Sequence, residues 1–100
     1  MDFNEAVGRA VQALRLNKGL TQKDFLGTLS IQYLSDIERG KRAPSISVLA
    51  QICERLEVHE AVPVILAKHF MRPSEPLTHT LREIERQLYV AGFAEYSPNP

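Results

Sequence analysis

The stretch YLSDIERGKRAPS, residues 33–45, contains the pattern that determines the expected fold. Its apolar residues Leu34 and Ile37 are three positions apart, as on one face of a helix. Gly40 suits the left-handed conformation in which many helices end, and Pro44 with Ser45 favours the start of another helix. The stretch therefore predicts two helices separated by a tight turn.

Helical spacing of apolar residues also precedes this stretch. Apolar positions within residues 3–14 predict a first helix that fades before Gly19. Thr21 can cap a second helix that begins at Gln22, and Thr28 and Ser30 are both suited to cap the third.

The second half of the chain continues as helices. We expect a fourth helix from Ser45 to Leu56 and a fifth over 59–70, whose Pro63 is tolerated in its first turn. The prolines of residues 71–76 indicate a linker, and a last helix is expected over 77–93. No strand pattern is present, so the predicted fold class is all-α.

Composition limits the class of protein. The chain has 100 residues, 12 basic and 12 acidic side chains and no net charge, which argues against a protein that coats nucleic acid indiscriminately. No segment is apolar for long enough to span a bilayer, and the N-terminus lacks the features of an export signal. Cys53 is the only cysteine and lies on an apolar helix face, which favours a buried thiol over a redox sensor.

Residue identities, in addition to periodicity, carry a resemblance. Arg15 is followed by GLTQ at 19–22, then by YLSDIERG at 33–40, KRAPS at 41–45 and LEV at 56–58. In this order the landmarks resemble the lambda-repressor/Cro family of helix-turn-helix transcriptional regulators, also called the XRE family. The resemblance implies a five-helix lambda-repressor-like DNA-binding domain, here over residues 1–70, with the last helix added to it.

The resemblance also assigns roles to side chains. It implies a buried ion pair between Arg15 and Glu38, which would tie the first helix to the third. The third helix would enter the major groove of double-stranded DNA, where Gln32 is the best candidate to pair with adenine. The implied base-contacting residues are Ser30, Ile31, Gln32, Ser35 and Asp36. The implied phosphate-contacting residues are Thr21, Gln22, Tyr33, Arg39, Lys41 and Arg42, with Lys18 and Lys23 as weaker candidates.

Several of these roles have alternatives. Ile31 either contacts a thymine methyl group or packs on the second helix, and Asp36 either accepts from cytosine or forms a local ion pair with Arg39 or Lys23. Tyr33 either bonds a phosphate or fills a partly buried edge. The basic residues after the helix are either phosphate contacts or ordinary solvated charges.

One departure from the family concerns the turn before the third helix. Thr21 and Ser30 are nine positions apart, about two fewer than in the family. Either the second helix is shortened, or the turn is rebuilt around Gly27 and Thr28. The register of residues 27–32 is therefore open at this stage.

The last helix suggests how the protein assembles. Leu77, Leu81, Ile84 and Leu88 recur at spacings of four, three and four, which is typical of a seam between helices. We expect this seam to form a homodimer that binds a two-fold symmetric operator, the alternative being that the helix folds back on its own domain. Residues 94–100 are expected to form a flexible tail.

The functional hypothesis is a sequence-specific regulator, a dimeric repressor or dual regulator, located in the cytoplasm and on the nucleoid when bound. The alternatives are an antitoxin that also binds DNA and a helix-turn-helix module used only for protein contact. The three histidines are ten residues apart, which does not place them on one helix face, and no arrangement of catalytic residues is present. We therefore expect no metal, no cofactor and no enzyme activity.

Overall fold

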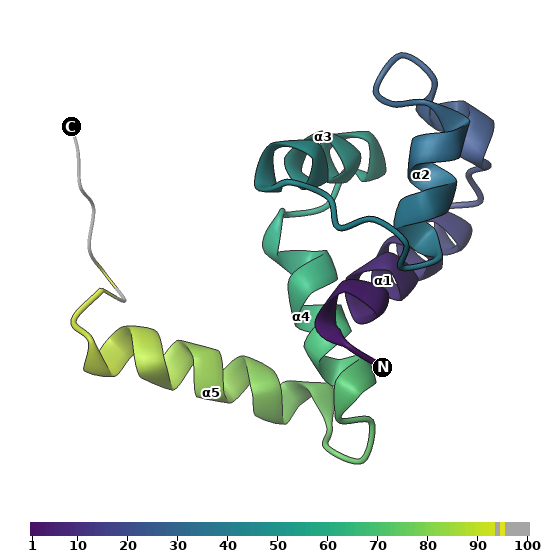
Figure 1. Cartoon of the computed structure of the whole chain (residues 1–100). Coiled ribbons are helices and arrows are strands. Elements are labelled where there is room, and N and C mark those ends of the chain that lie inside the picture. Colours follow the sequence, from purple (N-terminus) through teal and green to yellow (C-terminus); the bar gives the residue numbers. More distant parts are fainter. Residues whose placement is uncertain (94, 96–100) are drawn as a thin grey trace.

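The computed structural model describes residues 1–93 and 95, and within them it contains helices and no strands (Figure 1). The all-α prediction is confirmed. The elements are α1 (Phe3–Asn17), the 3₁₀ helix η1 (Gln22–Phe25), α2 (Ile31–Glu38), α3 (Ile46–Leu56), α4 (Ala61–Met71) and α5 (Leu77–Val90). The third helix of the sequence prediction is therefore α2.

Side-chain caps fix where three of the helices begin. The side chains of Asp2, Ser30 and Ser45 accept hydrogen bonds from the backbone N–H three residues later, at 2.8, 3.0 and 3.1 Å. Caps of this kind are each worth about 1 kcal/mol. Of the two candidates for α2, Ser30 is the cap and Thr28 is not.

The second helix is shorter than predicted. η1 is a single 3₁₀ turn, and Thr21 caps it in a capping box with Asp24. In this box Asp24 Oδ2 accepts from the Thr21 backbone N–H at 2.7 Å and from the Thr21 hydroxyl at 3.0 Å, which lowers the pKa of Asp24. Gly27 then turns the chain with φ +97°. The second helix is shortened and the turn is rebuilt around Gly27, so both alternatives named from the sequence occur together. The nine positions from Thr21 to Ser30 leave no room for a longer helix.

The main core lies between α1, η1, α2 and α3. Phe25 is fully buried and is the only buried residue of η1, so it anchors this short element. The fully buried members of this core are Val11, Phe25, Leu34, Ile37, Ile52 and Leu56. Burying a side chain of this size contributes about 1.5–3 kcal/mol, so α2 is held firmly by its inner face.

A second, smaller core joins α1 to α4. Ala6, Val7 and Ala10 on α1 pack with Ala67 on α4, and the small side chains let the two helices lie close together (Figure 1). Gly8, on the same helix, faces α2. A Cβ atom built on Gly8 would lie 2.0 Å from the carbonyl oxygen of Ile37, so the two backbones meet there.

The C-terminal helix departs from the prediction at its end. α5 ends at Val90, not at 93, because Ala91 caps it and Gly92 takes φ +84°. It has no buried residue and extends away from the other helices beyond its start near α4 (Figure 1). α4 likewise begins at Ala61, two residues later than expected. Of the predicted flexible tail, 94 and 96–100 lie outside the described residues.

No helix in the described part of the chain is long and apolar enough to cross a membrane.

Candidate nucleic-acid interface

α2 presents a polar N-terminal end on a buried scaffold. Leu34 and Ile37 are fully buried, which fixes the rotation of the helix about its axis. Ser30, Ile31 and Gln32 are exposed at its start. Ile31 is 36% exposed, so it neither packs fully on η1 nor projects entirely into solvent. This end of α2 is free to approach a partner.

A buried ion pair holds α2 against α1. Arg15 Nε donates to Glu38 Oε2 at 2.7 Å, and Arg15 Nη2 donates to Glu38 Oε1 at 2.9 Å. The two residues are only 8% and 4% exposed. Arg15 Nη1 also donates to the Leu20 carbonyl at 2.9 Å, and the hydrogen bonds to Glu38 raise the pKa of Arg15. One guanidinium thus joins α1, the following loop and α2.

Gln22 lies in this cluster, although the sequence analysis assigned it to a phosphate. Its Nε2 donates to Glu38 Oε1 at 3.1 Å, and the residue is half-buried. Thr21, the other residue assigned to a phosphate here, is exposed, but its hydroxyl is bonded to Asp24. These hydrogen bonds hold the start of η1 in place, and the phosphate contacts of Thr21 and Gln22 stay a prediction.

Asp36 takes part in local contacts along α2. Its Oδ1 accepts from Gln32 Nε2 at 2.9 Å and lies 3.4 Å from Arg39 Nη2. The Asp36 side chain is 19% exposed, whereas that of Arg39 is 54% exposed. The ion pair with Arg39 is one of the alternatives named from the sequence. Ser35 lies beside Asp36 in the chain and is half-buried.

The basic loop after α2 folds back over the end of that helix. Gly40 has φ +75°, and the backbone N–H groups of Lys41 and Arg42 donate to the Asp36 carbonyl at 2.8 and 3.3 Å. The Arg42 guanidinium lies 4.6 Å from the centre of the Tyr33 ring, a cation–π contact. Lys41 and Arg42 are exposed. Two positive charges are thus held at the C-terminal end of α2.

The weaker basic candidates occupy different surroundings. Lys18 lies 3.6 Å from the exposed carboxylate of Glu57. Lys23 is exposed on η1.

Two residues that support the site escaped the sequence analysis. Arg55 on α3 donates from Nε to the Asp24 carbonyl at 3.0 Å and lies over the Phe25 ring, so it fixes η1 to α3. Gly8 allows the close approach of α1 and α2. A glycine inside a helical pattern was the one available signal, since such a residue often marks close packing. Nothing in the sequence marks Arg55.

Neither a metal-binding group nor a reactive thiol occurs among the described residues. They contain no group of three or more histidine, cysteine or acidic side chains that could hold a metal ion. Cys53 is fully buried, and this burial, with a smaller contribution from Glu60, raises the pKa of its thiol to about 11. The thiol is therefore protonated at neutral pH and poorly reactive.

Comparison with known proteins decides the family. The model of the helix-turn-helix family matches residues 11–62, more than half of the chain. The chain belongs to this family, of the XRE type. The matched segment includes η1, α2 and α3, together with both partners of the Arg15–Glu38 pair.

Curated relatives and a solved structure agree with this assignment. The transcriptional regulator ClgR of Mycobacterium tuberculosis is 35% identical over 75 residues, which are 73% of this chain and 67% of ClgR. The helix-turn-helix regulator y4dJ of Sinorhizobium fredii is 40% identical over 58% of this chain and 78% of its own length. The crystal structure of the clp gene regulator ClgR from C. glutamicum superposes with a TM-score of 0.67 at 33% identity, covering 71% of this chain and 95% of that one.

With this family match and these relatives, the chain is a helix-turn-helix transcriptional regulator. Family membership implies DNA binding. It does not by itself assign bases or phosphates to side chains.

Proposed function

We propose that this protein is a dimeric, sequence-specific regulator, a repressor or dual regulator, whose α2 enters the major groove. The observation that carries the proposal is the exposed start of α2 on a rigid scaffold, next to a basic loop. Residues 1–70 form the DNA-binding domain, 71–76 connect it and 77–93 pair two copies. The name of one relative, a clp gene regulator, supports a role in gene regulation, and we place the protein in the cytoplasm, on the nucleoid when it is bound to its operator.

Base recognition is assigned to the first turn of α2. Gln32 is exposed, and a glutamine amide can pair with both N6 and N7 of adenine. Ser30, Ile31 and Ser35 complete this surface, and Ile31 exposes enough apolar area to meet a thymine methyl group.

Phosphate contacts are assigned to the other end of the helix. Arg39, Lys41 and Arg42 are exposed, and the Tyr33 ring positions the Arg42 guanidinium. Such charges release counterions from DNA and so add affinity on any sequence. Thr21 and Gln22, at the start of η1, are proposed as further phosphate contacts, and their hydrogen bonds also hold η1 and Glu38 in place.

Two substitutions separate these roles. We expect Arg42→Ala to weaken binding to a similar extent on all duplexes and to lower the salt dependence by about one counterion. Gln32→Ala should instead change the preference among sequences. Arg82→Ala on α5 removes the same charge far from α2 and is the matched control. Binding to DNA fragments selected from the genome, measured at several salt concentrations, tests this, and equal effects of both variants on sequence preference would contradict it.

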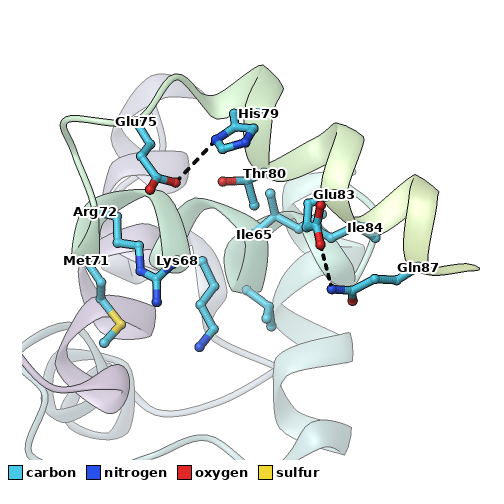
Figure 2. A pocket seen from close by; sticks show the side chains of 11 residues that line it. Ile65, Lys68, Met71, Arg72, Glu75, His79, Thr80, Glu83, Ile84 and Gln87 are labelled. Atoms are coloured by element: carbon cyan, nitrogen blue, oxygen red, sulfur yellow. Dashed lines mark hydrogen bonds and ion pairs between the residues drawn. The ribbon is translucent and has the colours of Figure 1, made fainter.

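Dimerisation is assigned to α5. Leu77, Leu81, Ile84 and Leu88 are 36–50% exposed within one chain, although a seam of this spacing normally packs on another helix. Beside it, α4 and α5 enclose a groove of about 690 Å³ with Ile65, Met71 and Ile84 among its lining residues (Figure 2). A second copy of α5 would cover the apolar face and bring two α2 helices onto one operator.

Sedimentation of the full chain tests the dimer. Replacing Leu81 and Leu88 together with Gln should raise the dissociation constant at least tenfold, because each leucine would lose about 1.5–3 kcal/mol of burial. Arg82→Gln, on a different side of α5, should leave it unchanged. A wild-type protein that remains monomeric at high micromolar concentration would refute this part of the proposal.

A further inference from the structure

Under the function proposed above, the contact between Gln32 and Asp36 bears on which base Gln32 prefers. The two residues are four positions apart on α2, so their side chains share one face. Gln32 Nε2 donates to Asp36 Oδ1 at 2.9 Å. Gln32 is exposed, while the Asp36 side chain is only 19% exposed. Asp36 therefore lies behind the glutamine amide, relative to a partner that approaches α2.

The hydrogen bond fixes which way round the amide lies. A carboxylate only accepts hydrogen bonds, so it attracts the NH₂ end of the amide and repels the oxygen end. Among the described residues, Gln32 Oε1 has no hydrogen-bond partner. One N–H and Oε1 thus remain for a base edge, with the nitrogen held on the Asp36 side.

This orientation matters because bases differ in the order of their donors and acceptors. Adenine offers an acceptor at N7 and a donor at N6, whereas guanine offers acceptors at N7 and O6. A free amide can turn so that both of its N–H groups point at the two acceptors of guanine. In an amide held by Asp36 one N–H is already used, and the remaining N–H and oxygen match the acceptor and donor of adenine but leave the oxygen against an acceptor of guanine.

Arg39 holds the carboxylate itself. Its Nη2 lies 3.4 Å from the same Oδ1 that accepts from Gln32. A bare carboxylate close to DNA would repel phosphates, and this contact offsets part of that charge. The three side chains follow one another along α2, with Gln32 nearest to its N-terminal end.

We propose that Asp36 is a positioning residue: it orients the Gln32 amide, and so makes this helix prefer adenine over guanine without contacting a base itself. The proposal rests on the proposed function, since it requires that Gln32 faces DNA.

The experiment uses the full-length protein and duplexes that it selects from a random-sequence library. The base pair whose preference disappears in Gln32→Ala is identified first and replaced by each of the other three pairs. Affinity is then measured for wild type, Gln32→Ala, Asp36→Ala, Asp36→Asn and the Gln32→Ala/Asp36→Ala double variant. Thermal unfolding confirms that each variant is folded.

The ratio of affinities for adenine and guanine is the decisive quantity, because Asp36→Ala also removes a negative charge and should raise affinity on every duplex. A bidentate pair discriminates roughly tenfold to a hundredfold, and we expect Asp36→Ala to lower that ratio at least about fivefold. In the Gln32→Ala background the Asp36 substitution should leave the ratio unchanged. Asp36→Asn keeps an acceptor oxygen and should retain most of the discrimination, which a purely electrostatic role for Asp36 would not predict.

Other outcomes overturn the inference in distinguishable ways. If Gln32→Ala loses discrimination and Asp36→Ala keeps it, Asp36 does not position the amide, while the proposed function stands. If Asp36→Ala changes preference equally in both backgrounds, Asp36 contacts a base directly. If the wild-type protein selects no sequence at all, the proposed function itself fails.

Discussion

Gly8→Ala tests the close approach between the backbones of α1 and α2. Gly8 lies within α1, where alanine normally stabilises a helix by about 1 kcal/mol relative to glycine. In this structure the added Cβ would lie 2.0 Å from the Ile37 carbonyl oxygen and 3.1 Å from its carbon. The oxygen cannot rotate away, because it belongs to α2 and accepts the Gly40 N–H at 3.0 Å.

Relief of this overlap requires α1 and α2 to move apart until the 2.0 Å distance reaches the 3.4 Å of ordinary contact. Such overpacking costs about 1–3 kcal/mol, and it also loosens the Arg15–Glu38 pair that spans the same two helices. Subtracting the helix-propensity gain from a cost at the upper end, we expect Gly8→Ala to lower the free energy of unfolding by about 2 kcal/mol and Tm by about 10 °C.

Denaturant unfolding followed by circular dichroism measures this difference. Arg9→Ala, at the next and exposed position of α1, is the control and should change stability by no more than about 0.5 kcal/mol. A Gly8→Ala variant as stable as the wild type, or more stable, would refute the reasoning, since helix propensity would then outweigh the steric contact.

Three further predictions concern two buried side chains and the cap of α2. Glu38→Ala leaves the Arg15 guanidinium buried without a carboxylate and should lower the free energy of unfolding by about 3–5 kcal/mol in denaturant titrations, whereas the exposed Glu54→Ala should stay near the wild type. The folded state raises the pKa of Cys53 from 9.0 to about 11, so its contribution to stability is complete below pH 9 and is lost as the pH rises towards 11; the wild type should lose stability relative to Cys53→Ala over that range, and parallel pH profiles would contradict this. Ser30→Ala removes the α2 cap and should lower the unfolding free energy by about 1 kcal/mol, as measured by thermal unfolding; Thr28→Ala is its control, and an equal loss in both would count against Ser30 as the cap.

The sequence predicts the helices well where apolar spacing is long and caps are present. α1, α2 and α3 appear close to their expected bounds, because side-chain caps and the left-handed Gly40 act within a few residues of the chain. The prediction is weakest around η1. A single turn offers little periodicity, and the structure of this turn depends on the distant Arg55.

Side-chain partners at the site were harder to predict than the site itself. The Arg15–Glu38 contact was named through family resemblance, whereas Gln22 was assigned to phosphate although its amide bonds Glu38. A polar residue at a helix start suits both roles, and the sequence gives no sign of the short distance between Gln22 and Glu38. Gly8 shows the same limit. The sequence shows that this position lacks a Cβ, but it does not show which atoms lie where a Cβ would be.

The packing of α1 on α4 has a consequence for how the protein is made. Ala6, Val7 and Ala10 leave the ribosome well before Ala67, the residue of α4 that packs on them. At about 5–20 residues per second, the apolar face of the first helix therefore waits for seconds before its partner emerges. The family match at 11–62 omits Ala6, Val7, Ala10 and Ala67. A nascent chain that already carries the whole matched segment is therefore still an unfinished domain, with an alanine surface open to chaperones or to other nascent chains.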